Sequence, residues 1–408
     1  MLNSHDPTAP STATHSVTQF TTGLIHHPYQ PPAGFDAVPP AVYRASTVIF
    51  PNVAALRKRD WQHKTGYTYG LHGTPSTFML EERIAALEGG KYCTLVPSGL
   101  AAVVLVGMAL LKSGDELLIP DNAYGPNKAF ASGELAAWGI THRFYDPMNP
   151  ADLAAKLSAK TRLVWLEAPG SITLEFPDLP ALVAVVKLHE NAHPLRIVTA
   201  LDNTWGAGIA FNAFDLGADI SAHALTKYPS GGADVLMGSI VTRDAALHQL
   251  VHMCHMRTGY GVAGNDAELI LRGLNSIALR YAAQDIATRE LAAWMQTQPQ
   301  IEKVFHPALP GSPGHAAWAR DCTAAACLFS VAFKPEISQA QVDQFCDGLK
   351  LFKLGYSWAG PMSLVVPYDI AAVRTLGWAH TGGFVRFSVG LEAVEDLRAD
   401  LAQALKRL

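Results

Sequence analysis

The sequence predicts an α/β protein with a large domain built on a mainly parallel sheet and a small C-terminal α+β domain. Its 408 residues exceed one typical domain. About half of the residues (49%) are hydrophobic and only 16% are charged, which supports a large core. Between about residues 91 and 243, short apolar runs of β type alternate with helical patterns, as in parallel sheets with crossover helices.

The elements of the large domain follow from this alternation. Strands are expected at Tyr92–Val96, Glu116–Pro120, Thr141–Tyr145, Arg162–Leu166, Ile197–Leu201, Ile220–Leu225 and Met237–Val241. Helical patterns lie between several of them, at Asn127–Trp138, Ala151–Ser158 and Leu179–Glu190. Ligands of such sheets gather at the carboxyl ends of the strands, so functional residues are expected there.

A long helical pattern over residues 265–299 begins at the capping pair Asn265-Asp266, runs to Met295, and is expected to link the two domains. The small domain after it should contain strands near Ile301–His306, Cys327–Phe333 and Phe384–Val389, and helices at Gln339–Leu349 and Ala393–Leu408. We therefore divide the chain into 1–73, a tail and subunit-contact arm, 74–272, an α/β domain, and 273–408, a C-terminal α+β domain. Residues 1–16 should be a mobile tail, and residues 17–73 show little periodicity.

Composition argues against several classes of function. The formal charge of −4 gives no reason to expect nucleic acid or anionic membrane as a partner. The five scattered cysteines are typical of reduced thiols in a cytoplasmic protein. No basic segment followed by an apolar one opens the chain, and the apolar stretch Leu95–Leu111 is interrupted by Pro97. We therefore expect neither a signal peptide nor a membrane span.

The strongest functional pattern joins two strand ends. Lys227 follows the apolar run that ends near Leu225, and Asp202 closes the run at Leu201. Either residue alone could be an ordinary strand-end residue. Together they are what a pyridoxal phosphate site needs, because a lysine forms a Schiff base with the cofactor and an aspartate keeps its pyridine nitrogen protonated.

Other segments could complete such a site, and each has a plainer interpretation. Pro97-Ser98-Gly99-Leu100 joins a strand to a helix, where backbone N–H groups suit a phosphate, or it is simply a turn. Tyr124 could stack on a flat ring or pack beneath its own turn. Arg386, within an apolar strand, could bind a substrate carboxylate or form a structural salt bridge.

His248, His252 and His255 have helical spacing, and His248 and His252 could face a metal ion. No H-E-x-x-H pattern or second ligand pair accompanies them. A solvated or interfacial histidine face is the favoured interpretation, and we expect no metal.

In combination, these segments resemble the Cys/Met-metabolism family of pyridoxal-phosphate-dependent enzymes from about residue 40 to the C-terminus. The matching pieces are Tyr69-Gly70 with Gly73-Thr74, Leu87-Glu88-Gly89-Gly90, Ser98-Gly99, Ala123-Tyr124, Leu166–Ser171, Asp202–Trp205, Thr226–Tyr228, His306–Gly311, Tyr356–Trp358, Arg386 and Gly390–Glu392. Trp205, Gly170-Ser171 and Ser357-Trp358 are most similar to the β-lyase branch. The resemblance implies the aspartate-aminotransferase-like fold and a homotetramer, a dimer of dimers whose sites are shared between subunits.

The resemblance also implies roles for residues. Lys227 would form the Schiff base, Asp202 would pair with the pyridine nitrogen, and Tyr124 would stack on the ring and act in catalysis. Phosphate ligands would come from Ser98, Gly99, Leu100 and Thr226, with Tyr69 of a neighbouring subunit. The substrate would contact Arg386, Ser357, Trp358, Tyr124 and His72.

Several positions depart from the family's pattern. Leu71 stands where the family often has a phosphate-binding arginine, and His72 where β-lyases often have another. Ala224 replaces a serine common in relatives, and Gly231-Gly232 replaces a Gly-His pair. The segment after Trp358 also differs, as Ala359–Leu364. These changes leave the reaction class intact but affect the expected substrate.

The implied activity is cleavage of L-cystathionine at its Cβ–sulfur bond, giving homocysteine, pyruvate and ammonia for methionine synthesis. The alternatives are a γ-acting member, such as a cystathionine γ-synthase or methionine γ-lyase, and a β-lyase of cystine or other cysteine S-conjugates. A catalytically inactive relative that serves as a binding protein is a further alternative. The retention of Lys227, Asp202 and Arg386 argues against it.

Overall fold

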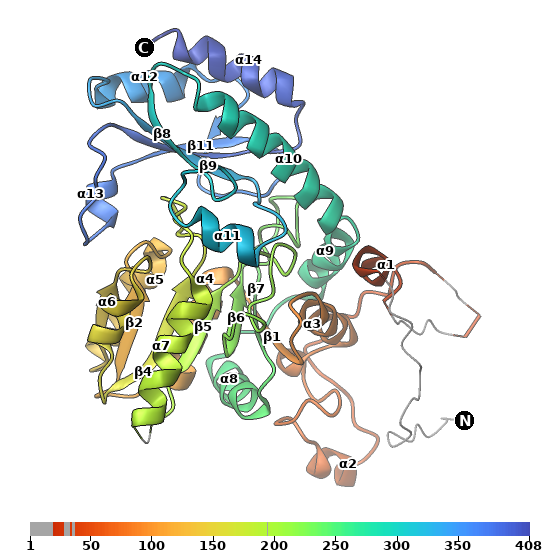
Figure 1. Cartoon of the computed structure of the whole chain (residues 1–408). Coiled ribbons are helices and arrows are strands. Elements are labelled where there is room, and N and C mark those ends of the chain that lie inside the picture. The colour runs from red at the N-terminus through yellow and green to blue at the C-terminus, as the bar shows by residue number, and fades with distance from the viewer. Residues whose placement is uncertain (1–18, 28–32, 35–36, 194) are drawn as a thin grey trace.

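The computed structural model describes residues 19–27, 33–34, 37–193 and 195–408. The tail expected at residues 1–16 lies outside them. Figure 1 shows a large α/β body with a smaller domain above it, and a long helix, α10 (Ile277–Met295), runs between the two.

The large sheet has seven strands in the order β1-β7-β6-β5-β4-β2-β3. Every neighbouring pair is parallel except those of β7, which runs antiparallel to both β1 and β6. The strands are β1 (Tyr92–Val96), β2 (Glu116–Pro120), β3 (Thr141–Tyr145), β4 (Thr161–Glu167), β5 (Val198–Asp202), β6 (Ile220–His223) and β7 (Gly238–Thr242). The predicted mainly parallel sheet is therefore confirmed.

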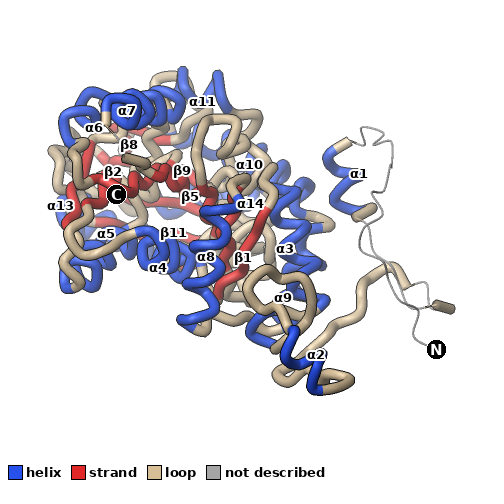
Figure 2. Tube along the Cα trace, turned by 90° about the horizontal axis from the view of Figure 1, so that it is seen from below, coloured by secondary structure: helices blue, strands red, loops and turns tan. Residues whose placement is uncertain are grey.

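Helices cover both faces of this sheet, as the view in Figure 2 shows. One face packs on α4 (Gly99–Leu110), α5 (Gly125–Phe130) and α8 (Ala245–Thr258). The other packs on α3 (Pro75–Leu87), α6 (Pro150–Lys156) and α7 (Leu179–Ala192). Apart from the partly exposed edge strand β3, the strands are thus buried on both sides, which explains why they read as mostly apolar runs. A π-helical turn, η2 (Ala131–Leu135), extends α5 and completes the helix predicted there.

The single helix predicted from residue 265 is in fact two, α9 (Gly264–Leu274) and α10. The break falls at Asn275 and Ser276, where the short polar side chain of Ser276 competes for a backbone acceptor. Ser276 Oγ donates to the carbonyl oxygen of Gly273 at 3.4 Å. Near its start α10 buries Tyr281 in the large-domain core, and at its end it buries Met295 in the small-domain core. The helix thus connects the two domains, and the boundary at residue 272 remains a prediction.

The small domain has a five-stranded sheet in the order β10-β11-β12-β9-β8. Its strands are β8 (Ile301–Phe305), β9 (Leu328–Phe333), β10 (Lys353–Leu354), β11 (Leu364–Tyr368) and β12 (Phe384–Ser388). Its helices are α11 (His315–Asp321), α12 (Gln339–Gly348), α13 (Ile370–Val373) and α14 (Val394–Leu405). The analysis of the sequence missed β10 and β11, because β10 has only two residues and Pro367 interrupts the strand pattern of β11.

The N-terminal arm is mostly irregular, as predicted. Among the arm residues that the structure describes, the regular elements are the short helices α1 (Phe20–Ile25) and α2 (Val53–Lys58) and the 3-10 turn η1 (Gly70–His72). Val38 is 97% exposed and Ile49 is 85% exposed. None of the described helices is long and apolar enough to cross a lipid bilayer.

A buried glutamate fixes the strand ends that will form the site. Glu88, fully buried at the end of α3, accepts hydrogen bonds from Asn203 Nδ2 at 2.9 Å and Ser221 Oγ at 2.7 Å. Its other oxygen lies 2.7 Å from His223 Nδ1. Asn203 follows β5 directly, and His223 ends β6. One carboxylate therefore ties together two neighbouring strand ends.

Replacing this carboxylate should destabilise the protein. Glu88→Ala leaves three buried polar groups without their partner, which we expect to cost about 3 kcal/mol. The measurement is the midpoint of thermal unfolding of the purified holoprotein. Glu134→Ala, at an exposed position of η2, is the matched control and should change stability by less than about 0.5 kcal/mol. Equal midpoints for the two variants would contradict the role given to Glu88.

Candidate functional site

The carboxyl ends of three adjacent strands bring polar groups to one edge of the large sheet. β4 ends at Glu167 and β5 at Asp202, and these two residues are partners in the strand register. β6 lies beside β5 and leads within four residues of its end to Lys227. The sheet topology therefore gathers side chains that are far apart in sequence, as predicted for a parallel sheet.

Lys227 lies beneath a segment of the small domain. Its Nζ donates a hydrogen bond to Ser357 Oγ at 2.8 Å and lies 5.3 Å from the ring centroid of Trp358. Burial lowers the pKa of Lys227 to about 8, and the positive charge of Arg386 acts in the same direction. A large fraction of this amine is therefore in the neutral, nucleophilic form near pH 8.

Asp202, which ends β5, is partly buried, and its charge interacts with that of Lys227. Its Oδ1 accepts a hydrogen bond from the backbone N–H of Thr204 at 3.0 Å. Burial raises the pKa of Asp202, although the Thr204 bonds and the charges of His223 and Lys227 oppose this shift. A cationic nitrogen held against Asp202 would supply the partner that its charged form lacks.

Glu167 is a neighbour that the analysis of the sequence did not single out as a site residue. Its Oε2 accepts the backbone N–H of Tyr124 at 2.8 Å, at the start of α5. Burial raises the pKa of Glu167 well above its usual range, and Asp202 adds to the effect. Burial also raises the pKa of Tyr124, with further contributions from Asp202 and Glu167. Glu167 follows an apolar run, as Asp202 does, and this position could have identified it from the sequence.

The start of α4 forms a cradle suited to a phosphate. Ser98 caps this twelve-residue helix and accepts from the N–H of Ala101 at 3.0 Å. Gly99 lies so close to Ala224 that an added Cβ would fall 2.5 Å from the Ala224 Cβ. Thr226 lies two residues beyond Ala224, and its Oγ1 accepts from the N–H of Met237 at 3.1 Å. These features fit pyridoxal phosphate, with backbone N–H groups and a helix dipole at the phosphate end.

Arg386 is the candidate for a substrate carboxylate. The residue, in β12, is only 6% exposed, and its Nη1 donates to the carbonyl oxygen of Ser171 at 2.9 Å. Its guanidinium carbon lies 5.3 Å from the ring centroid of Tyr368. No carboxylate in the described part of the chain pairs with Arg386. The residue therefore does not form the structural salt bridge considered above. Burial lowers its pKa, so an anion entering the site would relieve an unfavourable desolvated charge.

Tyr69 and His72 have their polar and ring contacts within the arm. The Tyr69 hydroxyl accepts from Ser46 Oγ at 3.4 Å. His72 Nδ1 lies 2.7 Å from Thr68 Oγ1, and its ring stacks on Trp61. Burial, and then the charge of Arg59, lower the pKa of His72. His72 is therefore neutral at pH 7, and its role at a site remains a prediction.

The three histidines of α8 form a stack rather than a convergent set of ligands. His252 lies between His248 and His255, with ring centroids 5.7 and 6.4 Å apart and nearly parallel planes. Burial lowers their pKa values to about 4 for His248 and His255 and about 3 for His252. Within the described residues, no three His, Cys, Asp or Glu side chains are placed to hold a metal ion.

Comparisons with known proteins agree with this arrangement. The sequence profile of the family described as Cys/Met metabolism PLP-dependent enzyme matches residues 21–406. Cystathionine beta-lyase from Salmonella typhimurium is 36% identical over 96% of this chain and 99% of its own length. Cystathionine beta-lyase MetC from Escherichia coli is 37% identical over 91% of this chain and 94% of its own. The structure of cystathionine gamma synthase from Xanthomonas oryzae pv. oryzae matches with a TM-score of 0.85 and 29% identity, covering 95% of this chain and 97% of that one.

The buried amine gives a prediction about pH. In the cofactor-free protein, Lys227 should react with acetic anhydride with a midpoint near pH 8, whereas exposed lysines generally titrate near ~10.4. Because the folded-state pKa is lower than the unfolded one, the folded state binds fewer protons between these values. The contribution of this group to stability therefore rises with pH across that window and falls as pH drops toward 8. The midpoint is measured by mass spectrometry of peptides labelled across pH 6–11. A midpoint above about 10 for Lys227 would refute the lowered pKa of its amine.

Proposed function

Because the chain belongs to the Cys/Met metabolism family of pyridoxal-phosphate-dependent enzymes, we propose that it is a carbon–sulfur β-lyase that cleaves L-cystathionine. One water is consumed, and the products are homocysteine, pyruvate and ammonia. The observation that carries the proposal is the contact of the Lys227 amine with Ser357 and Trp358, near the guanidinium of Arg386, with which no carboxylate of the described residues pairs. In this proposal Lys227 is the base, Arg386 is the carboxylate receptor, and Trp358 is an aromatic wall beside the base.

The side chains divide the work between them. Lys227 holds the cofactor and then takes the proton from the substrate Cα, for which a pKa near 8 is well suited. Asp202 would keep the pyridine nitrogen of the cofactor protonated, and Tyr124 would stack on its ring. Pyridoxal phosphate itself supplies the electron sink for the negative charge at Cα. Arg386, with Ser357 and Trp358, orients the α-carboxylate so that the Cα proton points toward Lys227.

Assembly is part of the proposal. The exposed apolar residues of the arm, Val38 and Ile49, would be covered in a homotetramer built from two dimers. Tyr69 and His72 would then reach the active site of a neighbouring subunit, where Tyr69 contacts the cofactor phosphate. We also place the enzyme in the cytoplasm and in methionine biosynthesis.

The alternative with specific support is a γ-acting enzyme, because the chain is also 29% identical to a cystathionine gamma synthase along almost its whole length. A γ-acting enzyme releases 2-oxobutanoate from cystathionine or methionine, whereas a β-lyase releases pyruvate. The identity of the oxo acid therefore separates the two functions.

The decisive experiment incubates the purified holoenzyme separately with cystathionine, cystine, cysteine and methionine. We expect thiol and pyruvate from cystathionine and no 2-oxobutanoate. Lys227→Ala should remove turnover by at least about 10⁴-fold, because base and cofactor anchor are both lost, while circular dichroism remains unchanged. 2-Oxobutanoate as the main product would refute the β-lyase proposal, and substantial activity of Lys227→Ala would refute the role of the lysine.

The two departures in the arm give a prediction about specificity. Leu71 has no polar atom for a phosphate, and His72 is neutral at pH 7. A missing charge-assisted hydrogen bond typically costs roughly 1.5–3 kcal/mol, or about 10–100-fold in affinity. Leu71→Arg should therefore slow loss of cofactor on dialysis, and His72→Arg should raise the ratio of kcat/KM for cystathionine over cystine. Unchanged values would mean that other residues already fill these roles.

A further inference from the structure

A loop of the small domain is fastened to the large domain by buried charges. Arg374, just after α13, contacts Asp121 through Nε at 3.0 Å and Glu175 through Nη1 at 2.8 Å. Asp121 follows β2 directly and also accepts the backbone N–H groups of Thr375 and Leu376, each at 2.9 Å. The side chains of Arg374 and Asp121 are 7% and 0% exposed.

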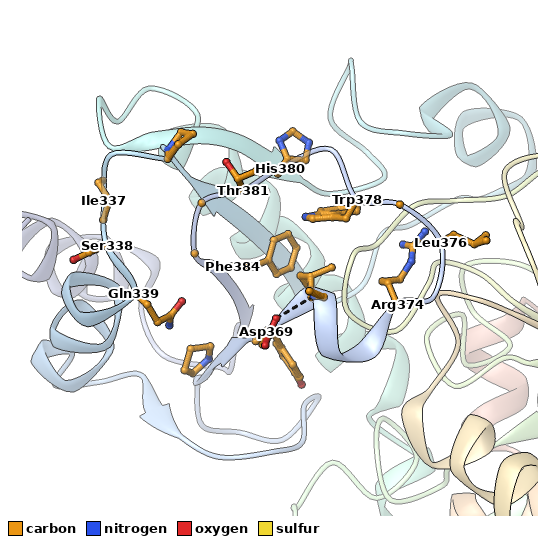
Figure 3. Close-up of a pocket in the computed structure, with 18 of the residues that line it drawn as sticks. Ile337, Ser338, Gln339, Asp369, Arg374, Leu376, Trp378, His380, Thr381 and Phe384 are labelled. Atoms are coloured by element: carbon orange, nitrogen blue, oxygen red, sulfur yellow. Dashed lines mark hydrogen bonds between the residues drawn. The ribbon is translucent and has the colours of Figure 1, made fainter.

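The other side of the same loop borders a cavity of about 910 Å³ in the small domain. Figure 3 shows Arg374 and Leu376 along one side of this cavity and Ser338 and Gln339 along the opposite side. The loop is therefore not supported by packing on all sides. Its position is held by the anchor at Asp121 and Glu175 together with the packing of Trp378 on Phe305 and Phe384.

Asp121 remains charged at any pH at which an enzyme normally works. Burial acts to raise the pKa of Asp121, but hydrogen bonds from Thr375, Leu376 and Lys128 outweigh it and hold the pKa at about 2. Lys128 Nζ adds a bond to Asp121 Oδ1 at 3.0 Å and one to the carbonyl oxygen of Val373 at 2.8 Å.

A continuous path of hydrogen bonds leads from this anchor to Arg386. Glu175 Oε2, which binds Arg374, also accepts from Asn122 Nδ2 at 3.1 Å. The carbonyl oxygen of Asn122 accepts the N–H of Ser171 at 3.0 Å. The carbonyl oxygen of Ser171 in turn accepts from Arg386 Nη1 at 2.9 Å.

Gly170 makes the close approach in this path possible. A Cβ at residue 170 would fall 2.3 Å from Asn122 Nδ2, so a larger residue would push apart the segments at Asn122 and Ser171. The path is therefore tightly packed between Asn122 and Ser171.

We propose that Arg374 is a positioning residue for the carboxylate site. Through Glu175, Asn122 and Ser171, it holds the guanidinium of Arg386 in place. The inference rests on the proposed role of Arg386 as the carboxylate receptor. Loss of Arg374 should loosen the Ser171 carbonyl and misplace Arg386. Binding of the substrate carboxylate should then weaken, while the chemistry at Lys227 is preserved.

The test compares two probes that differ only in the carboxylate, L-alanine and ethylamine. Each binds the holoenzyme through its amine, and its dissociation constant is measured from the change in cofactor absorbance. Arg374→Ala should raise the constant for alanine on the order of tenfold and that for ethylamine less than about twofold. With the lyase substrate, KM should rise by a similar factor and kcat should change by less than about threefold.

Three further variants sharpen the test. Arg374→Lys keeps the charge and should restore part of the affinity for alanine. Glu175→Gln preserves the shape of the side chain and should weaken alanine binding even if Arg374→Ala fails to fold. Arg320→Ala is the matched control, because Arg320 also joins the domains, through two bonds to Asp178 at 2.9 and 3.0 Å, but is half exposed and has no path to Ser171. It should leave both probes unchanged.

The outcomes separate this inference from the proposed function. If Arg386→Ala leaves the ratio of the two dissociation constants unchanged, Arg386 does not bind the carboxylate, and both proposals about this site fall. If that ratio collapses in Arg386→Ala but stays at its original value in Arg374→Ala and Glu175→Gln, only the role of Arg374 is refuted. Equal weakening of alanine and ethylamine in Arg374→Ala would likewise refute it, because a general loss of structure affects both probes.

Discussion

Lys227 and Arg386 are two cationic groups that interact in a largely desolvated region. The rest of the site depends on how the electrostatic repulsion between them is reduced. Burial lowers the pKa of both groups, and the charge of Arg386 contributes further to the low pKa of Lys227. In the proposed site, an amino-acid substrate would bring its carboxylate to Arg386, and the cofactor would bond to the amine of Lys227. Binding of the two ligands would then remove the cost of holding these two desolvated positive charges in the free chain.

The sheet places these groups, and buried polar networks keep them in place. Glu88 ties the end of β5 to the end of β6 from below, at Asn203 and His223. Arg374 ties the small domain to the end of β2 from the side, at Asp121. Neither network is needed to form a hydrophobic core, and burying the charged groups of each network has an unfavourable desolvation free energy. Both instead fix a strand end next to a residue of the site, which is where an error of about 1 Å would matter most.

Much of this arrangement could be predicted from the sequence because it depends on local patterns. Lys227 and Asp202 follow apolar runs, and strands of a parallel sheet end at a common edge, so their proximity follows from the fold class. The break at Asn275 was missed because periodicity continues across it and only the backbone competition of Ser276 interrupts the helix. Arg374 was missed for a different reason. Its partners Asp121 and Glu175 are about 250 and 200 residues away, and no spacing rule connects them.

The arm shows where a single chain is insufficient to define the site. Its apolar residues Val38 and Ile49 are exposed, and Tyr69 and His72 have polar contacts only with other arm residues. An isolated subunit gains little from holding such a segment in one conformation, because ordering it costs conformational entropy without burying much apolar surface. A neighbouring subunit would supply that surface. The position of Leu71 and His72 would then be set by assembly, so subunit contact and substrate selection would be controlled by the same segment of chain.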